Sequence, residues 1–180
     1  MNITIVRTVL TVTAALVSVE VQAAPVSFRS LQLAGTGCSR NTTVVSGKRT
    51  STASIAFTKY DAASSSSHAA SGMRRTSCNL IAPVKVAPGF RLSSVTATWQ
   101  GHAQGKTEFL RESFTSGQRG KQKKSLPTGN YTRRDRFTIQ SGCAGDTVPL
   151  RINSSVRTRG KNSHIKMEKV RLRLHWRTCH

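Results

Sequence analysis

The sequence predicts an all-β fold, an antiparallel β-sandwich of jelly-roll or immunoglobulin-like architecture held together by two disulfides. Turn-forming residues recur roughly every 8–12 positions, and the segments between them alternate apolar and polar residues with a period of two. Convincing amphipathic helices are absent, and four cysteines provide an even number of cross-linking groups. The 180 residues suit one domain. The lack of sustained heptads and of a second long apolar run excludes a coiled coil and a transmembrane bundle.

Residues 1–23 have the pattern of a cleavable secretory signal peptide. Arg7 closes a short basic region, Thr8–Val19 is apolar but too short to span a bilayer comfortably, and small residues precede a cleavage point after Ala23. An N-terminal anchor or an apolar strand is the alternative interpretation. We expect a secreted protein whose residues 24–180 form a single β-sandwich domain without a transmembrane segment. The oligomeric state stays open.

All four cysteines lie after the leader, where an oxidising compartment favours disulfides. Three connectivities are possible, and we expect Cys38–Cys78 and Cys143–Cys179 because each bridge would close a segment with its own strand pattern. Each bridge would close a loop of about 40 residues and contribute roughly 3–4 kcal/mol in the chain-entropy model. Structural zinc is the alternative, but the close C-x-x-C spacing of zinc sites is missing. We therefore expect neither a metal nor a cofactor.

The elements follow from local patterns along the chain. Asp61–Gly72 is rich in Ser and Ala and has no apolar stripe, which predicts a flexible loop. Ala87–Gly89 and Leu126–Asn130 predict turns, because Pro presets φ while Gly or Asn tolerates a positive φ. Alternation with a period of two predicts short strands in three further segments. These segments are Val95–Trp99, Phe137–Ile139 and Val148–Ile152.

The sharpest strand signal is Val170–Arg177, where apolar residues alternate with Arg or His. Successive side chains of a strand point to opposite faces, so one face is expected to be buried and the other to form a row of positive charge. The buried face would hold Val170, Leu172, Leu174 and Trp176, and the charged face Arg171, Arg173, His175 and Arg177. Just upstream, Ile165 and Met167 are apolar at odd positions, so the parity slips by one at Glu168 and Lys169. A β-bulge or a turn there would restore the register.

Seven short patches, in order, resemble a known family. They are Gly35–Cys38, Arg75–Leu80, Val86–Phe90, Gln100–Ala103, Ser141–Ala144, Leu150–Ser155 and Leu174–Cys179. As a set they extend from about Ala34 to Cys179, and with them the chain resembles the domain of unknown function 4360 family of small secreted fungal and bacterial proteins. The resemblance implies secretion, a β-rich domain and two disulfides, and it supplies no catalytic residues. The chain departs from the near-neutral members of that family, because Lys and Arg fill its loops.

The strongest functional signal is charge. The chain has 28 Lys and Arg against 7 Asp and Glu, a formal net charge of +21, and loss of the leader removes one charge of each sign. Basic runs flank the turn at Pro127 and could crowd one end of a hairpin, and a third group is the Val170–Arg177 row. The candidate polyanion-binding residues are Lys121, Lys123, Lys124, Arg133, Arg134, Arg136, Arg171, Arg173 and Arg177.

Clustered cations of this kind neutralise phosphates, sulfates or carboxylates and release their counterions. The expected partner is therefore an extracellular anionic polymer or surface: a nucleic acid such as DNA, an anionic glycan, or an envelope lipid. Sequence-specific reading of nucleic acid is not expected, because aromatic residues are few and no RNA-binding or zinc-finger signature is present. The alternative is a soluble cationic exterior that recruits nothing specific.

A secreted hydrolase, such as a ribonuclease-like enzyme, is the second hypothesis. It would use His102 with Glu108 or Glu112, or His175 on the basic row, with Lys or Arg stabilising developing charge. The sequence contains no nucleophile elbow, no His-Glu-x-x-His and no P-loop, so we expect a binder rather than an enzyme.

A protein-binding effector, adhesin or inhibitor is the third hypothesis. It would use the segments Asp61–Gly72 and Ser116–Gly129 as loops against an acidic partner, since the loops of β-sandwiches often carry binding.

Overall fold

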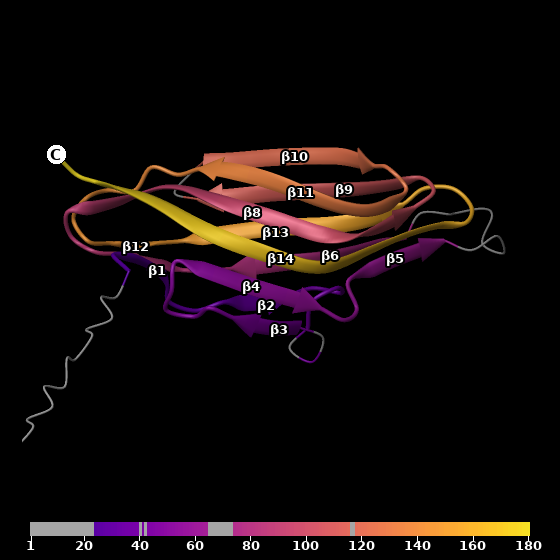
Figure 1. The fold of residues 1–180 in the computed structure, drawn as a ribbon, viewed down its shortest axis with the longest axis horizontal. Coiled ribbons are helices and arrows are strands. Elements are labelled where there is room, and N and C mark those ends of the chain that lie inside the picture. The colour runs from indigo at the N-terminus through magenta and orange to yellow at the C-terminus, as the bar shows by residue number, and fades with distance from the viewer. Residues whose placement is uncertain (1–23, 40, 42, 65–73, 116–117) are drawn as a thin grey trace, which may run out of the picture.

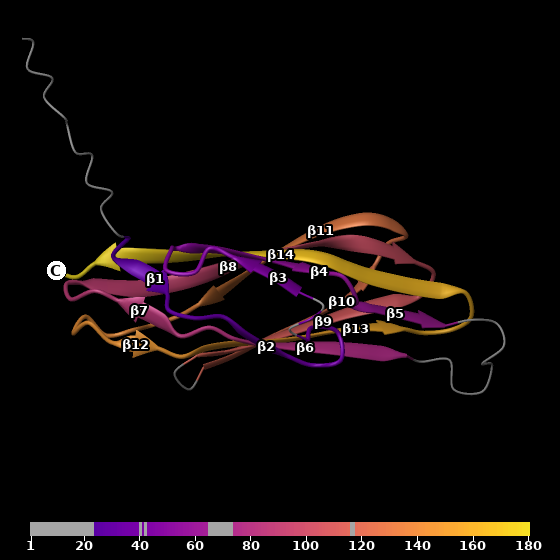
Figure 2. The same cartoon turned by 90° about the horizontal axis from the view of Figure 1, so that it is seen from below.

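Two antiparallel β-sheets face each other in the structure, a computed structural model, and confirm the predicted all-β sandwich (Figures 1 and 2). The structure describes residues 24–39, 41, 43–64, 74–115 and 118–180. The expected signal peptide at residues 1–23 lies outside these described residues. Among them, no helix is long and apolar enough to cross a membrane.

The larger sheet has six strands. Five run in the spatial order β11, β8, β14, β4 and β3, and β5 pairs with β14 beside β4 (Figure 1). Their bounds are β11 (Gly129–Thr138), β8 (Phe90–Gln104), β14 (Ser163–Thr178), β4 (Thr52–Phe57), β3 (Thr43–Ser46) and β5 (Asp61–Ser64). The two long strands, β8 and β14, pair along most of their length and form the centre of this sheet.

The facing sheet has five strands in the order β10, β9, β13, β6 and β2. Their bounds are β10 (Gln118–Leu126), β9 (Thr107–Thr115), β13 (Leu150–Thr158), β6 (Arg75–Ile81) and β2 (Gln32–Ala34). A small third sheet of β1 (Val26–Phe28), β7 (Val84–Val86) and β12 (Thr147–Val148) lies at one end of the sandwich, on the left in Figure 2.

The core lies between the two main sheets and is built from the inward-facing residues of each strand. Aromatic and aliphatic side chains from both sheets are buried there, among them Phe109 from β9 and Ile55, Leu172 and Val95 from the six-stranded sheet. Burial of these alternating side chains stabilises the sandwich by roughly 1.5–3 kcal/mol for each large apolar side chain. The polar residues that alternate with these buried side chains face outward.

The predicted strands are present, with ends that depend on pairing. Val95–Trp99 lies within β8 and Val170–Arg177 within β14. Phe137 and Thr138 end β11. Pro149 divides the predicted Val148–Ile152 strand between β12 and β13, because proline has no N–H to donate to a ladder.

The predicted slip in β14 is a β-bulge. The pairing of β14 with β8 shifts between Met167 and Lys169, so that Glu168 has no partner in the register. Upstream, Ile165 and Met167 are buried, and downstream Val170 is buried, as the alternation required. The buried face extends through Leu172 and Leu174 to Trp176, which is half-buried and packs against the core.

Two segments expected to be loops are strands for at least part of their length. Asp61–Ser64 forms β5, in which Ala62 and Ser64 are buried and the small side chains gave too weak an alternation to recognise. Residues 65–73, the rest of that predicted loop, lie outside the described residues. In the second segment, Ser116–Gly129, most residues form β10, a polar edge strand whose pairing with β9 does not depend on an apolar pattern.

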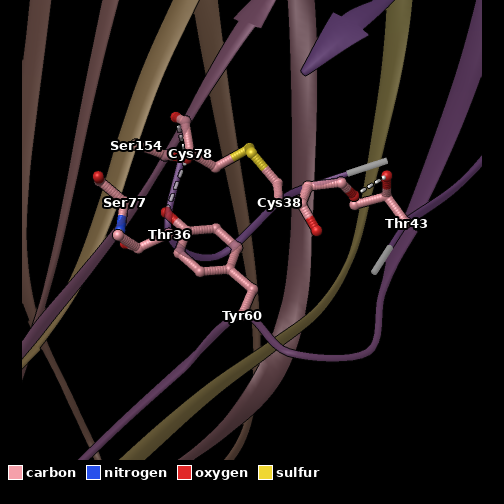
Figure 3. Close-up of a disulfide and its surroundings, with 8 residues drawn as sticks. Thr36, Cys38, Thr43, Tyr60, Ser77, Cys78 and Ser154 are labelled. Carbon is pink, nitrogen blue, oxygen red and sulfur yellow. Dashed lines mark hydrogen bonds between the residues drawn. A yellow bond between two sulfur atoms is a disulfide. The ribbon is translucent and has the colours of Figure 1, made fainter. Parts of the chain in front are cut away.

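Both predicted disulfides are confirmed. Cys38 bonds to Cys78 and Cys143 bonds to Cys179. The first lies beside the fully buried Tyr60, whose hydroxyl donates to Ser154 Oγ at 2.8 Å (Figure 3). Ser154 Oγ in turn donates to the Cys78 carbonyl at 3.3 Å. Burial raises the pKa of Tyr60, so its hydroxyl stays protonated as the donor of this small network.

Candidate functional site

An open groove of about 1000 Å³ lies on the outer face of the six-stranded sheet. It crosses β11, β8 and β14 and reaches the start of β4, four strands that lie side by side in Figure 1. Five exposed basic side chains line it: Arg134, Arg136, Lys169, Arg171 and Arg173. The described residues of the lining include no Asp or Glu. We call this feature the cationic groove.

Local alternation explains why these side chains face outward. In β14, Val170, Leu172 and Leu174 are buried against the core, so the arginines between them are forced to the outer face. In β11, Asp135 and Phe137 are buried in the same way, which places Arg134 and Arg136 outside. The bulge at Glu168 then brings Lys169 onto the same face as the β14 arginines.

Strand pairing orders the cations into a grid. Residues of β8 stand between a cation of β11 and a cation of β14 in two successive rows. The rows are Arg134, Thr98 and Arg171, and Arg136, Thr96 and Arg173. At the level of the Cα atoms, two strand spacings separate the cations of a row by about 10 Å, and two residues separate the rows by about 7 Å. The result is two columns of positive charge with neutral hydroxyls between them.

Polar contacts fix two side chains at one end of the groove. Arg136 Nε donates to Ser94 Oγ at 3.0 Å, and His175 Nε2 lies 2.9 Å from Thr96 Oγ1. The pKa of His175 is lowered from its ordinary value of 6.5, first by burial and then by the positive charges of Arg136 and Arg173. The imidazole in the groove is therefore neutral at neutral pH and can gain a charge when the solution is acidified.

The structure brings together four of the nine predicted residues: Arg134, Arg136, Arg171 and Arg173. It adds Lys169, which the sequence analysis did not select. The signal for Lys169 was present in the predicted bulge, because a one-residue slip after Met167 turns Lys169 toward the basic face.

The other predicted residues lie elsewhere. Arg177 is exposed nearer the end of β14, opposite Arg91, and Arg133 is half-buried opposite the buried Trp99, on the inner face. Lys124 is exposed on β10, in the other sheet. For Lys121 and Lys123 the structure describes only the backbone, which pairs in β10 with Glu112 and Leu110.

The expected crowding of two basic runs at one hairpin is wrong. The chain turns at Pro127 and Thr128, but β10 joins the five-stranded sheet and β11 the six-stranded sheet. The two strands pair with β9 and β8, so the run from Lys121 to Lys124 is separated from Arg134 and Arg136. A turn between strands can cross from one sheet of a sandwich to the other, which the local sequence does not reveal.

Asp135, one of the few carboxylates in the chain, forms a buried ion pair. Arg111 of β9 and Asp135 of β11 make two parallel hydrogen bonds between the sheets, at 2.7 Å and 2.8 Å. Trp99 Nε1 donates to the same carboxylate at 2.9 Å, and Arg111 also donates to the carbonyl of Phe109. Sequence reasoning did not find this pair, since its partners come from different sheets. The Asp135 charge points inward and is neutralised there.

The proposed catalytic pairings of His102 do not form. His102 lies on β8 at a position facing outward from the six-stranded sheet, where its Nδ1 is 3.1 Å from Asn130 Oδ1. Glu108 and Glu112 occupy positions of β9 that face outward from the other sheet, and Glu108 accepts from Arg159 at 3.0 Å. The two outer faces of a sandwich are separated by its core, so neither glutamate reaches His102. In the described part of the chain, no group of three His, Cys, Asp or Glu residues could hold a metal ion.

Comparisons with known proteins give one family and several distant structural likenesses, two of which follow. A family model described as "Domain of unknown function (DUF4360)" matches residues 24–179. A comparison with curated proteins gives no match. Among solved structures, TmCBM61 in complex with β-1,4-galactotriose is 10% identical, with a TM-score of 0.39 over 85% of this chain and 91% of that chain. The enzymatically active domain of bacteriophage CBA120 tailspike protein 4 is 11% identical, with a TM-score of 0.28 over 83% of this chain and 19% of that chain.

Proposed function

The chain belongs to the DUF4360 family, whose function is unknown, and we propose from its cationic groove that it is an exported protein that binds an extracellular anionic polymer. The binding site is the cationic groove on the outer face of the six-stranded sheet. Arginine binds phosphate, sulfate or carboxylate through two parallel N–H groups, and lysine acts as a compact charge. Binding releases the counterions condensed on the polymer, which supplies much of the driving force.

One observation carries this proposal: five exposed cations share a groove whose described lining holds no carboxylate. The outer face of the five-stranded sheet differs, because it also carries Glu108 and Glu112 on β9. There Glu108 pairs with Arg159 at 3.0 Å and with Arg157 at 3.7 Å. The groove therefore gathers positive charge that no carboxylate of its described lining offsets, a grouping that a cationic exterior serving solubility alone does not need.

The test compares a variant that loses two charges of the groove with a variant that loses two charges elsewhere. The groove variant is Arg171→Gln with Arg173→Gln. The control is Arg75→Gln with Arg151→Gln, two exposed strand residues on the outer face of the other sheet. Affinity for a short DNA duplex is measured over a range of salt concentrations. For the groove variant, the slope of log Kobs against log salt should become shallower by about 2 relative to the native chain.

The control variant should keep most of the native slope, although both variants lose the same net charge. Both should unfold at the native denaturant midpoint, since all four residues are exposed. Equal slopes for the two variants would show that only net charge matters, and the cationic groove would then not be the binding site.

A further inference from the structure

We infer, building on the proposed function, that the polymer is a single acidic polysaccharide chain bound lengthwise over β8. The cationic groove has a floor and two walls. Thr96, Thr98 and Gln100 of β8 line the floor. Lys169 and the two arginines of β14 form one wall, and the arginines of β11 form the other.

The spacing of the walls suits one polymer chain. The β11 and β14 strands lie on either side of β8, so their Cα columns are about 10 Å apart. A single chain lying on β8 meets cations on both sides at intervals of about 7 Å, one row at a time. A nucleic-acid duplex is wider than this gap and would rest on the tips of the arginines without reaching the floor.

The hydrogen-bonding groups on the floor of the groove favour a carbohydrate ligand. The hydroxyls of Thr96 and Thr98 and the amide of Gln100 each donate and accept hydrogen bonds. Carbohydrate hydroxyls also do both, so they can pair with such a floor while their acidic groups meet the walls. Arg136 is held toward β8 by its bond to Ser94 Oγ, which keeps its guanidinium at the side of the groove.

Other anionic polymers fit the lining less well. Proteins bind single-stranded nucleic acid largely by stacking bases on exposed aromatic rings. The described lining has two aromatic rings: the imidazole of His175, which is held by its contact with Thr96, and Trp176, which is half-buried and packs against the core. An anionic lipid surface calls for exposed apolar side chains beside the cations, but Leu174, the aliphatic residue of the lining, is 1% exposed.

The decisive variant alters the floor and leaves every charge in place. Thr98→Val with Gln100→Met keeps the side-chain volumes and removes the hydrogen-bonding groups. The control is Thr147→Val with Gln32→Met, two exposed strand residues outside the groove. Four probes are compared by calorimetry: polygalacturonate for carboxylates, heparin for sulfates together with carboxylates, linear polyphosphate, and oligo(dT).

The native chain should bind a glycan probe more tightly than polyphosphate or oligo(dT) at equal salt. Loss of two floor hydrogen bonds should weaken glycan binding about tenfold. Binding of polyphosphate should be unchanged, and the control variant should behave like the native chain. Tighter binding of polygalacturonate identifies carboxylate as the acidic group, and tighter binding of heparin, which carries both groups, shows that sulfates contribute.

Two results would overturn the inference and leave the proposed function standing. One is a floor variant that binds glycans as tightly as the native chain, and the other is preferential binding of oligo(dT) or polyphosphate. A groove variant of Arg171 and Arg173 that loses no affinity for any probe would instead overturn the proposed function itself. A floor variant without effect therefore counts against the polysaccharide, and a groove variant without effect counts against the proposed function.

Discussion

Asp135 and Arg111 show what a single pair of residues contributes to this sandwich. Each side chain is almost fully buried, and each comes from a different sheet. The carboxylate accepts two hydrogen bonds from the guanidinium and one from Trp99, so its buried charge is compensated. The guanidinium also lies 4.5 Å from the centre of the Phe109 ring. The pair therefore ties the two sheets together near the β9 and β11 side of the core.

Asp135→Ala should lower the free energy of unfolding by about 3–5 kcal/mol, because it leaves a buried guanidinium and the Trp99 N–H without their acceptor. Urea denaturation followed by tryptophan fluorescence measures the loss. The double variant Arg111→Met with Asp135→Leu removes both charges and should recover much of it. If the double variant is no more stable than Asp135→Ala, the ion pair is not the source of the effect.

His175 makes the groove sensitive to pH. Burial lowers its pKa first, and the charges of Arg136 of β11 and Arg173 of β14 lower it further, while Thr96 of β8 contacts its Nε2. Because the folded chain resists protonation of this group, its contribution to stability falls as pH falls through the ordinary His pKa of 6.5. A bound polyanion instead favours the protonated imidazole, because its negative charges attract the added positive charge.

Heparin, whose sulfates stay ionised, should therefore bind more tightly at about pH 5 than at about pH 7. His175→Gln should reduce this gain and leave the affinity at about pH 7 nearly unchanged. The measurement is elution from a heparin column at the two pH values. An equal gain in the native and variant chains would assign the effect to the other histidines.

At the scale of the element, β14 depends on its bulge. Glu168 has no register partner on β8, so the residues before and after it can both place their apolar side chains inward. Met167 and Val170 are buried on either side of it, at positions of opposite parity. The bulge therefore reconciles two alternating patterns within one continuous strand, and it also directs Lys169 into the groove.

Deletion of Glu168 should be better tolerated than deletion of Arg171. Without Glu168, β14 pairs regularly with β8 from His164 to His175, and every other residue keeps its face. Without Arg171, either Leu172 and Leu174 turn outward or a charged residue turns inward, which is far more costly. Denaturation midpoints of the two single-residue deletions measure the difference. Equal midpoints would mean that Glu168 does not occupy the bulge.

Elements with weak apolar patterns were the ones that sequence reasoning missed. Val170–Arg177 was predicted because Val, Leu and Trp alternate with charges there. In β5 the buried residues are Ala62 and Ser64, whose small side chains give little hydrophobic contrast. In β10, polar residues from Gln118 to Ser125 precede the one strongly apolar position, Leu126, and the strand forms because β9 offers it a hydrogen-bonding edge.

At the scale of the whole molecule, the distribution of charge follows from strand order. The net charge of +21 leaves few carboxylates, and those that the structure describes are unevenly placed. Asp135 is buried between the sheets, and Glu108 pairs with arginines on the outer face of the five-stranded sheet. Among its described lining residues, the cationic groove contains none. The sandwich thus has one described groove in which the positive charges have no carboxylate among them.

The disulfides were predictable at this scale because each joins cysteines about 40 residues apart within one half of the chain. Cys38–Cys78 links the region before β3 to β6, and Cys143–Cys179 links the region before β12 to the end of β14. Neither pairing required knowledge of the sheet order. The grid of arginines did require it, since Arg134 and Arg171 are neighbours only through Thr98 of β8.

The sequence favoured the observed disulfide pairs among three possible connectivities. By itself it determined the fold class, the parity slip in β14 and which arginines of that strand face solvent. These features depend on the alternation of nearby residues and on the parity of side chains along a strand. The tertiary structure decided that β10 and β11 join different sheets and that β11 and β14 lie on either side of β8. Such pairings depend on contacts between distant segments, because the backbone groups of a strand can pair with any edge that the rest of the fold presents. The cationic groove is the product of both: local alternation turned its cations outward, and strand order brought them together.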